Sequence, residues 1–130
     1  MKFCILIFIL LKTTFSFSQS LQRKDTIKMI CREWKFKEVY SDNFDENIAK
    51  DFIESARLLF KLNMTGIMKD EEWKDDFKWS YNSSKKSVTF EMKDGKALFR
   101  IILLSSSMMK LEAIDPGTQI FSSGTLVPAK

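Results

Sequence analysis

The sequence predicts an all-β protein, an eight-stranded antiparallel meander barrel with a short N-terminal helix and one short helix between the first two strands. Apolar and polar side chains alternate over most of the chain, which is the period of a strand with one buried face. Turn-forming residues recur about every 8–12 residues in the second half, a spacing typical of sandwiches and barrels. The 130 residues suffice for one domain, and a composition of 45% hydrophobic and 29% charged residues is that of a folded globular chain.

The N-terminal segment has the three parts of a secretory signal peptide. Lys2 gives a basic start, residues 3–11 form an unbroken apolar run, and a stretch with alternating small residues ends at Ser18. A bilayer span needs roughly 20 apolar residues, so this run is too short to span one, and Lys12 directly after it disfavours the alternative of an uncleaved N-terminal anchor. The sequence therefore predicts a cleaved signal peptide at 1–18 and a mature domain at 19–130 that is periplasmic or secreted.

Removal of the signal peptide changes what the charges and the cysteines imply. Lys2 and Lys12 leave with it, so 19 basic and 17 acidic residues remain and the net charge falls from +4 to +2. Because these bases alternate with acids, we expect no clustered basic face for nucleic acid. Cys4 is also removed, which leaves Cys31 without a partner for an intramolecular disulfide. Cys31 lacks the preceding small residue and adjacent apolar run of a lipidated cysteine, so we expect neither a lipoprotein nor a membrane span in the mature chain.

The first third of the mature chain combines two short helices with one strand. Residues 25–32 are expected to form one or two helical turns. The period of two then predicts a strand over 34–40 with its aromatic side chains inward. Apolar residues spaced by four predict a short amphipathic helix at about 46–56. The residues of this spacing are Phe44, Ile48, Phe52 and Ala56.

Strands and turns account for the rest of the chain. Residues 63–66 are expected to form a turn. The pair at 94–95, Asp-Gly, predicts a two-residue hairpin, since a type I′ turn needs positive φ at both positions. Residues 98–104 are almost all apolar, so we expect this strand to be buried on both faces or to face a helix. The expected strands after the second helix cover residues 58–62, 67–72, 77–81, 88–92, 98–104, 109–113 and 118–127.

The types of residue present exclude several kinds of chemistry. Histidine is absent, which excludes Ser-His-Asp and Cys-His catalysis and any His-ligated metal. Two cysteines cannot form a Cys₃ or Cys₄ zinc site. The acidic residues around Trp73 lack the glycine and the spacing of a calcium loop, and we interpret them as a solvated hairpin loop. We therefore expect no metal, no cofactor and no enzyme, with Glu38 as a lone general base the weakest alternative.

Several segments resemble small bacterial lipocalin-like domains. In that family a tryptophan opens the first strand just after a short helix, as Trp34 does here, and a second tryptophan strand follows a turn with a glycine, as Trp79 follows Gly66. The likeness covers roughly residues 26–115, and Arg32 stands where the family usually has a glycine. It implies a barrel that forms a cup for a small apolar molecule. The similar segments are residues 32–39, 57–62, 77–81, 87–91, 99–102 and 108–112.

The alternating aromatic positions are the candidate ligand-binding residues. If the barrel has a cavity, these side chains line an apolar site with a few polar anchors. The alternative is a filled core, since aromatic side chains bury large areas and can close a small barrel. The candidate interior residues are Trp34, Phe36, Glu38, Tyr40, Phe77, Trp79, Tyr81, Phe90 and Arg100.

Glu38 and Arg100 are the charged members of that set. A buried charge is costly unless it is paired, so they either pair with each other, hold a polar group of a ligand, or lie in water at the barrel mouth. Trp73 lies on an expected loop, where it either anchors a protein partner or packs across the barrel mouth. Two functions remain open: non-catalytic binding of a small, mainly apolar molecule, or a filled barrel that recognises another envelope protein through Trp73 and the loops.

Overall fold

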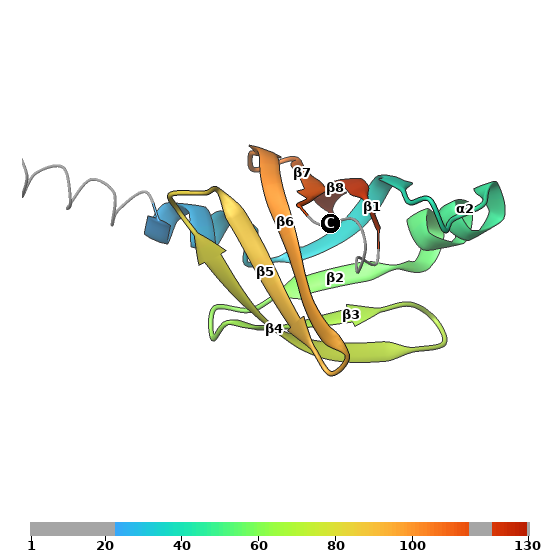
Figure 1. Cartoon of the computed structure of the whole chain (residues 1–130), viewed down its shortest axis with the longest axis horizontal. Coiled ribbons are helices and arrows are strands. Elements are labelled where there is room, and N and C mark those ends of the chain that lie inside the picture. The colour runs from blue at the N-terminus through green and yellow to red at the C-terminus, as the bar shows by residue number, and fades with distance from the viewer. Residues whose placement is uncertain (1–22, 115–120, 130) are drawn as a thin grey trace, which may run out of the picture.

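Eight antiparallel strands close into a barrel in which each strand pairs with the next along the chain and the last pairs with the first. The computed structural model describes residues 23–114 and 121–129 (Figure 1). The meander barrel expected from the sequence is confirmed, whereas the expected signal peptide at 1–18 lies outside the described residues. The strands are β1 (Glu33–Tyr40), β2 (Arg57–Phe60), β3 (Thr65–Lys69), β4 (Lys74–Asn82), β5 (Ser87–Met92), β6 (Gly95–Leu104), β7 (Met109–Ala113) and β8 (Ser123–Pro128).

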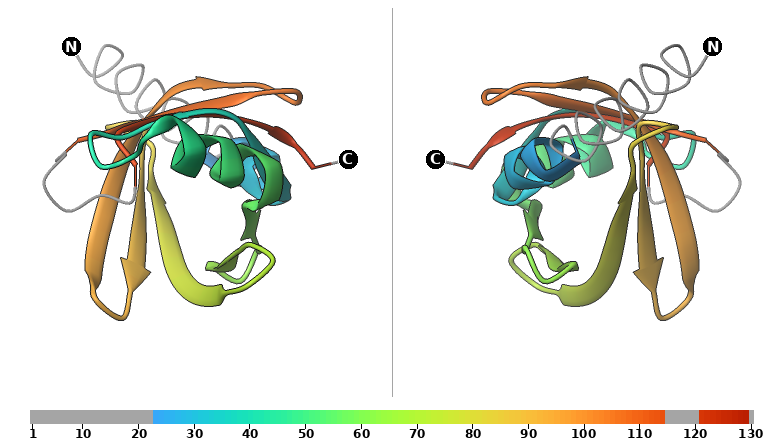
Figure 2. Two further views of the ribbon diagram at one scale, coloured as in Figure 1. Left: turned by 90° about the vertical axis from the view of Figure 1, so that its right-hand side faces the viewer. Right: turned by 90° about the vertical axis from the view of Figure 1, so that its left-hand side faces the viewer.

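Two helices lie at opposite ends of the barrel (Figure 1 and Figure 2). The first covers residues 23–30 and buries Ile30, whose carbonyl oxygen accepts a 2.9 Å hydrogen bond from Trp34 Nε1. The Arg32 guanidinium lies 5.3 Å from the centre of the Trp34 ring and donates to the Ser106 carbonyl at 2.9 Å. These contacts close one end of the barrel around Trp34.

The second helix, α2 (Glu46–Ser55), covers the other end. It begins at Asp45, whose carboxylate accepts a 2.8 Å hydrogen bond from the Ile48 N–H and so caps the free N–H groups of the first turn. The helix matches the segment expected from the apolar spacing of four. Phe52 on its inner face has its ring centre 4.7 Å from that of Phe36, which extends the aromatic core into the helix.

The structure differs from the expected turn at 63–66, because Gly66 lies inside β3. A Cβ atom at position 66 would overlap the Phe77 ring and lie 2.6 Å from the Leu59 carbonyl oxygen. The positive φ of the turn falls instead on Met64, at 65°. Gly66 is therefore present to make room for an interior ring and not to reverse the chain.

A β-bulge in β1 reverses the expected alternation. The pairing of β1 with β8 shifts between Phe36 and Glu38, which inserts one extra residue and moves every later side chain to the opposite face. Val39 then packs against the core, and Tyr40 is 61% exposed. The expectation that Glu38 and Tyr40 face the interior is wrong for this reason.

The expectation for residues 98–104 is also wrong. Only one face of β6 is buried: Phe99 is fully buried, whereas Leu98 is 38% and Ile102 is 52% exposed on the other face. Arg100 alternates with Phe99 and is exposed. Because almost all of these residues are apolar, the sequence does not show which face of β6 is buried. The face that carries Phe99 is the one that packs into the core.

Candidate functional site

A chain of contacting aromatic rings runs through the barrel interior. Phe90 is fully buried, and its ring centre lies 5.2 Å from that of Phe77, 5.3 Å from Phe99 and 5.6 Å from Phe60. Centroid separations of roughly 4.5–7 Å are those of aromatic pairs in contact. Further contacts join Phe60 to Trp79, and Phe99 through Phe121 to Phe36 and Phe52.

Most of the candidate interior residues belong to this aromatic core. Tyr81 is half-buried and packs against it. The rings of this core contact one another at the separations given above. A role of these residues in ligand binding stays a prediction. The candidates that are at most 3% exposed are Trp34, Phe36, Phe77, Trp79 and Phe90.

Sequence reasoning missed three residues of the aromatic core. Phe60, Phe99 and Phe121 are each at most 2% exposed. Phe60 and Phe99 lack the clean alternation of Phe77 and Trp79, because an apolar leucine precedes each of them; the sign that remained was a second apolar residue two positions earlier, Leu58 or Ala97, which is also buried. Phe121 lies in the segment expected to form the last strand, but it precedes β8 and reaches the core from the connection before that strand.

The charged candidates lie outside the barrel. Glu38 of β1 is aligned with Thr125 of β8, whereas Arg100 of β6 is aligned with Glu112 of β7. The strands β7 and β8 therefore separate Glu38 from Arg100, so of the three alternatives for these charges, a pair between them does not form. Both side chains are exposed and cannot anchor a ligand inside the barrel.

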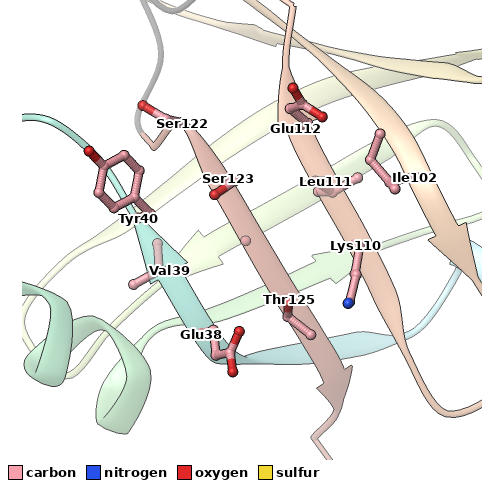
Figure 3. A pocket seen from close by; sticks show the side chains of 11 residues that line it. Glu38, Val39, Tyr40, Ile102, Lys110, Leu111, Glu112, Ser122, Ser123 and Thr125 are labelled. Atoms are coloured by element: carbon pink, nitrogen blue, oxygen red, sulfur yellow. The ribbon is translucent and has the colours of Figure 1, made fainter.

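A hollow of about 620 Å³ lies on the outer face of β6, β7, β8 and β1 (Figure 3). Its floor is β8, which contributes the short side chains of Ser123 and Thr125. Longer side chains from β1, β7 and β6 border the floor. These are Glu38, Tyr40, Lys110, Glu112 and Ile102.

Trp73 lies in the turn between β3 and β4 and is 38% exposed. The Asp70 carboxylate accepts hydrogen bonds from the Glu72 N–H at 2.7 Å and the Trp73 N–H at 2.9 Å. The Asp70 N–H donates to the Trp73 carbonyl at 3.0 Å, which completes the turn. Trp73 therefore lies on a turn, as expected, with an ordered backbone and part of its indole in solvent. The expected loop is shorter than the sequence indicated, because Asp75 and Asp76 pair with β3 and belong to β4.

The remaining chemistry of the described residues is limited. In residues 23–114 and 121–129, no cluster of three or more His, Cys, Asp and Glu side chains has the arrangement needed to hold a metal ion. Cys31 is half-buried, and desolvation raises the pKa of its thiol above the ordinary value. A raised pKa keeps the thiol protonated at neutral pH, where it is a poor nucleophile.

Comparison with known proteins adds no relative. No protein-family model, no curated protein and no solved structure matches the chain. In the part of the chain that the structure describes, no helix has both the length and the apolar character needed to cross a membrane. The assignment of a function therefore depends on the barrel interior, its outer hollow and the turn at Trp73.

Proposed function

We propose that the protein is an exported, non-catalytic barrel of the lipocalin-like type that binds another protein through the β3–β4 turn. The placement of its large aromatic side chains supports this proposal. The interior rings pack on one another, whereas Trp73 is held outside them by the hydrogen bonds of Asp70. A tryptophan on an ordered turn loses little conformational entropy on binding, and tryptophan is enriched among the residues that dominate interface energies.

The charges around Trp73 indicate the chemistry of the partner. Four acidic side chains flank the indole in sequence, all of them exposed, with Lys74 as the one base among them. A partner that offers an apolar pocket rimmed by lysine or arginine would complement this turn, and its association rate would fall as the salt concentration rises. The four acidic residues are Glu71, Glu72, Asp75 and Asp76.

A photo-crosslinking amino acid at position 73, expressed in the native envelope, tests the proposal. Met29 is the matched control position, since it is 37% exposed and lies on the helix at 23–30. We expect a discrete crosslinked protein from position 73 and none from position 29. With that protein purified, Trp73→Ala should weaken binding by at least about tenfold, as is common for a tryptophan at an interface. Identical products from both positions, or none from position 73, would contradict the proposal.

Binding of a small apolar molecule inside the barrel is the competing hypothesis from the sequence. Titration of a fatty-acid probe into a protein of residues 19–130 measures such binding through the fluorescence of Trp34 and Trp79. Because both indoles are at most 3% exposed and Trp79 contacts the Phe60 ring, we expect no probe uptake at micromolar concentration. Saturable uptake with quenching of these indoles would favour the carrier function over protein binding.

A further inference from the structure

We propose that the outer face of β6, β7, β8 and β1 binds a second copy of this chain and forms a two-fold symmetric dimer. This face and the β3–β4 turn lie on opposite sides of the barrel (Figure 2), so the inference does not depend on the protein partner proposed for Trp73. The face carries exposed apolar side chains beside charges of both signs. The register of the strands shows how two copies of it match.

Strand pairing arranges the outward side chains in two rows that cross the four strands. The rows are two residues apart along each of β7, β8 and β1, and on these three strands both rows border the hollow of the outer face (Figure 3). In the order β6, β7, β8, β1, the first row is Leu103, Lys110, Thr125, Glu38, and the second row is Arg100, Glu112, Ser123, Tyr40.

A two-fold axis that crosses the strands midway between the rows places each row opposite the other row of the second copy. Lys110 then faces Glu112 of the second copy, and Glu38 faces the Tyr40 side chain, whose hydroxyl donates to Asp42 Oδ1 at 3.1 Å within its own chain. Each contact occurs twice because of the symmetry. A two-fold axis along the strands would instead set Lys110 opposite Thr125 and Glu38 opposite an apolar leucine, so the arrangement of charges favours the axis across the strands.

Apolar contacts lie near the same axis. Ile102, which is 52% exposed, is the extra residue of the bulge between Ile101 and Leu103, so it lies between the two rows. The axis brings it close to Ile102 of the second copy. Leu103, which is 45% exposed, faces Arg100, whose aliphatic stem can cover it. The face therefore has an apolar strip along its β6 edge, beside the charges of Lys110 and Glu112 on β7.

The charged side chains of this face are free to make these contacts. The ion pairs among the described residues are Lys69–Glu33 and Lys96–Glu91, and neither uses a charge of the two rows. Two acids and two bases give the face no net charge, so two copies do not repel each other. Because the axis sets β8 opposite β8 of the second copy, short side chains face short side chains over the hollow of about 620 Å³, and the longer side chains of β7 and β1 that border it make the contacts.

The expected affinity is modest because the face is small. Four strands at a spacing of about 4.8 Å span only about 15 Å, which is narrower than the interfaces of stable dimers, so we expect a dissociation constant of roughly 10–100 µM. Sedimentation equilibrium of the mature chain measures this dissociation constant. Protein concentrations from about 5 µM to 1 mM bracket the expected value.

Charge reversal tests the two-fold arrangement. Lys110→Glu and Glu112→Lys each place like charges opposite each other, and each should weaken the homodimer by at least about tenfold. An equimolar mixture of these two variants restores both attractive contacts, so it should associate at least as tightly as the wild-type protein. The matched controls are Lys78→Glu and Glu91→Lys, on paired positions of β4 and β5. Each control variant alone, and an equimolar mixture of the two, should associate as tightly as the wild-type protein.

Several results would overturn the proposal. A monomer throughout the concentration range excludes the dimer, and a dimer that both single variants leave unchanged places the interface elsewhere. The two-fold contact between Lys110 and Glu112 is excluded if the mixture of their two variants associates no more tightly than either variant alone. It is also excluded if mixing the two control variants increases their association by the same factor. Trp73→Ala should leave self-association unchanged, so loss of the Trp73 partner and loss of the dimer can be told apart.

Discussion

Replacing Phe90 by alanine measures how completely the barrel is filled. Phe90 is fully buried and contacts three other rings, with centres 5.2–5.6 Å away. Truncation of a buried phenylalanine to alanine costs about 3–5 kcal/mol, and the loss of three ring contacts favours the upper half of that range. The stability of a domain is about 5–15 kcal/mol, so the variant should fold with a Tm lower by roughly 15–30 °C.

Urea denaturation followed by circular dichroism gives the free energy of unfolding of each variant. Phe44→Ala is the matched control, since Phe44 is half-buried and its ring contacts Phe52 at a centre distance of 5.5 Å; it should cost about 1 kcal/mol. The cavity in Phe90→Ala should bind benzene, so benzene should raise the Tm of this variant and not that of the wild type. A cost below about 1.5 kcal/mol, or equal stabilisation of the wild type by benzene, would refute a filled interior.

Three further outcomes follow from individual contacts. Gly66→Ala should lower the free energy of unfolding by about 1–3 kcal/mol in urea denaturation, because its Cβ would overlap the Phe77 ring; an unchanged midpoint would contradict this. Asp45→Ala should cost about 1 kcal/mol by the same assay, whereas Asp45→Asn should retain the cap and cost little. The native Cys31 thiol should react with iodoacetamide more slowly at pH 8 than in the urea-unfolded chain, because burial raises its pKa and leaves less thiolate; equal rates would contradict the shielding.

The regular parts of the fold could be predicted because their signals are local. Phe77 and Trp79 alternate with lysine and serine, and this alone defines a strand with one buried face. The spacing of four that predicts α2 is equally local. Gly66 was misassigned to a turn because the reason for the glycine is the Phe77 ring, which comes from the next strand. A constraint set by tertiary contact leaves no mark in the residues beside it.

The orientation of Glu38 and Tyr40 could not be predicted from alternation alone, yet the sequence held a sign of it. Lys37 and Glu38 are consecutive charged residues in a strand that otherwise alternates, and both are exposed. A charge at an interior position costs several kcal/mol unless it is paired, so a bulge that turns Glu38 outward is the less costly solution. Two charged residues in succession, Lys37 and Glu38, indicate a bulge, whereas unbroken alternation of the strand would place Glu38 and Tyr40 inside the barrel.

The two bulges connect the filled interior to the surface that we propose for self-association. One lies in β1 at residues 36–38 and the other in β6 at residues 101–103, on the two outer strands of the four-stranded face. The first turns Tyr40 outward, and the second places the exposed Ile102 between the rows of that face. Without them, strict alternation would direct Tyr40 into a core already occupied by Phe36 and Phe121. The bulge in β1 that keeps Tyr40 out of the core thus also supplies an exposed side chain of the outer face, and the bulge in β6 supplies Ile102.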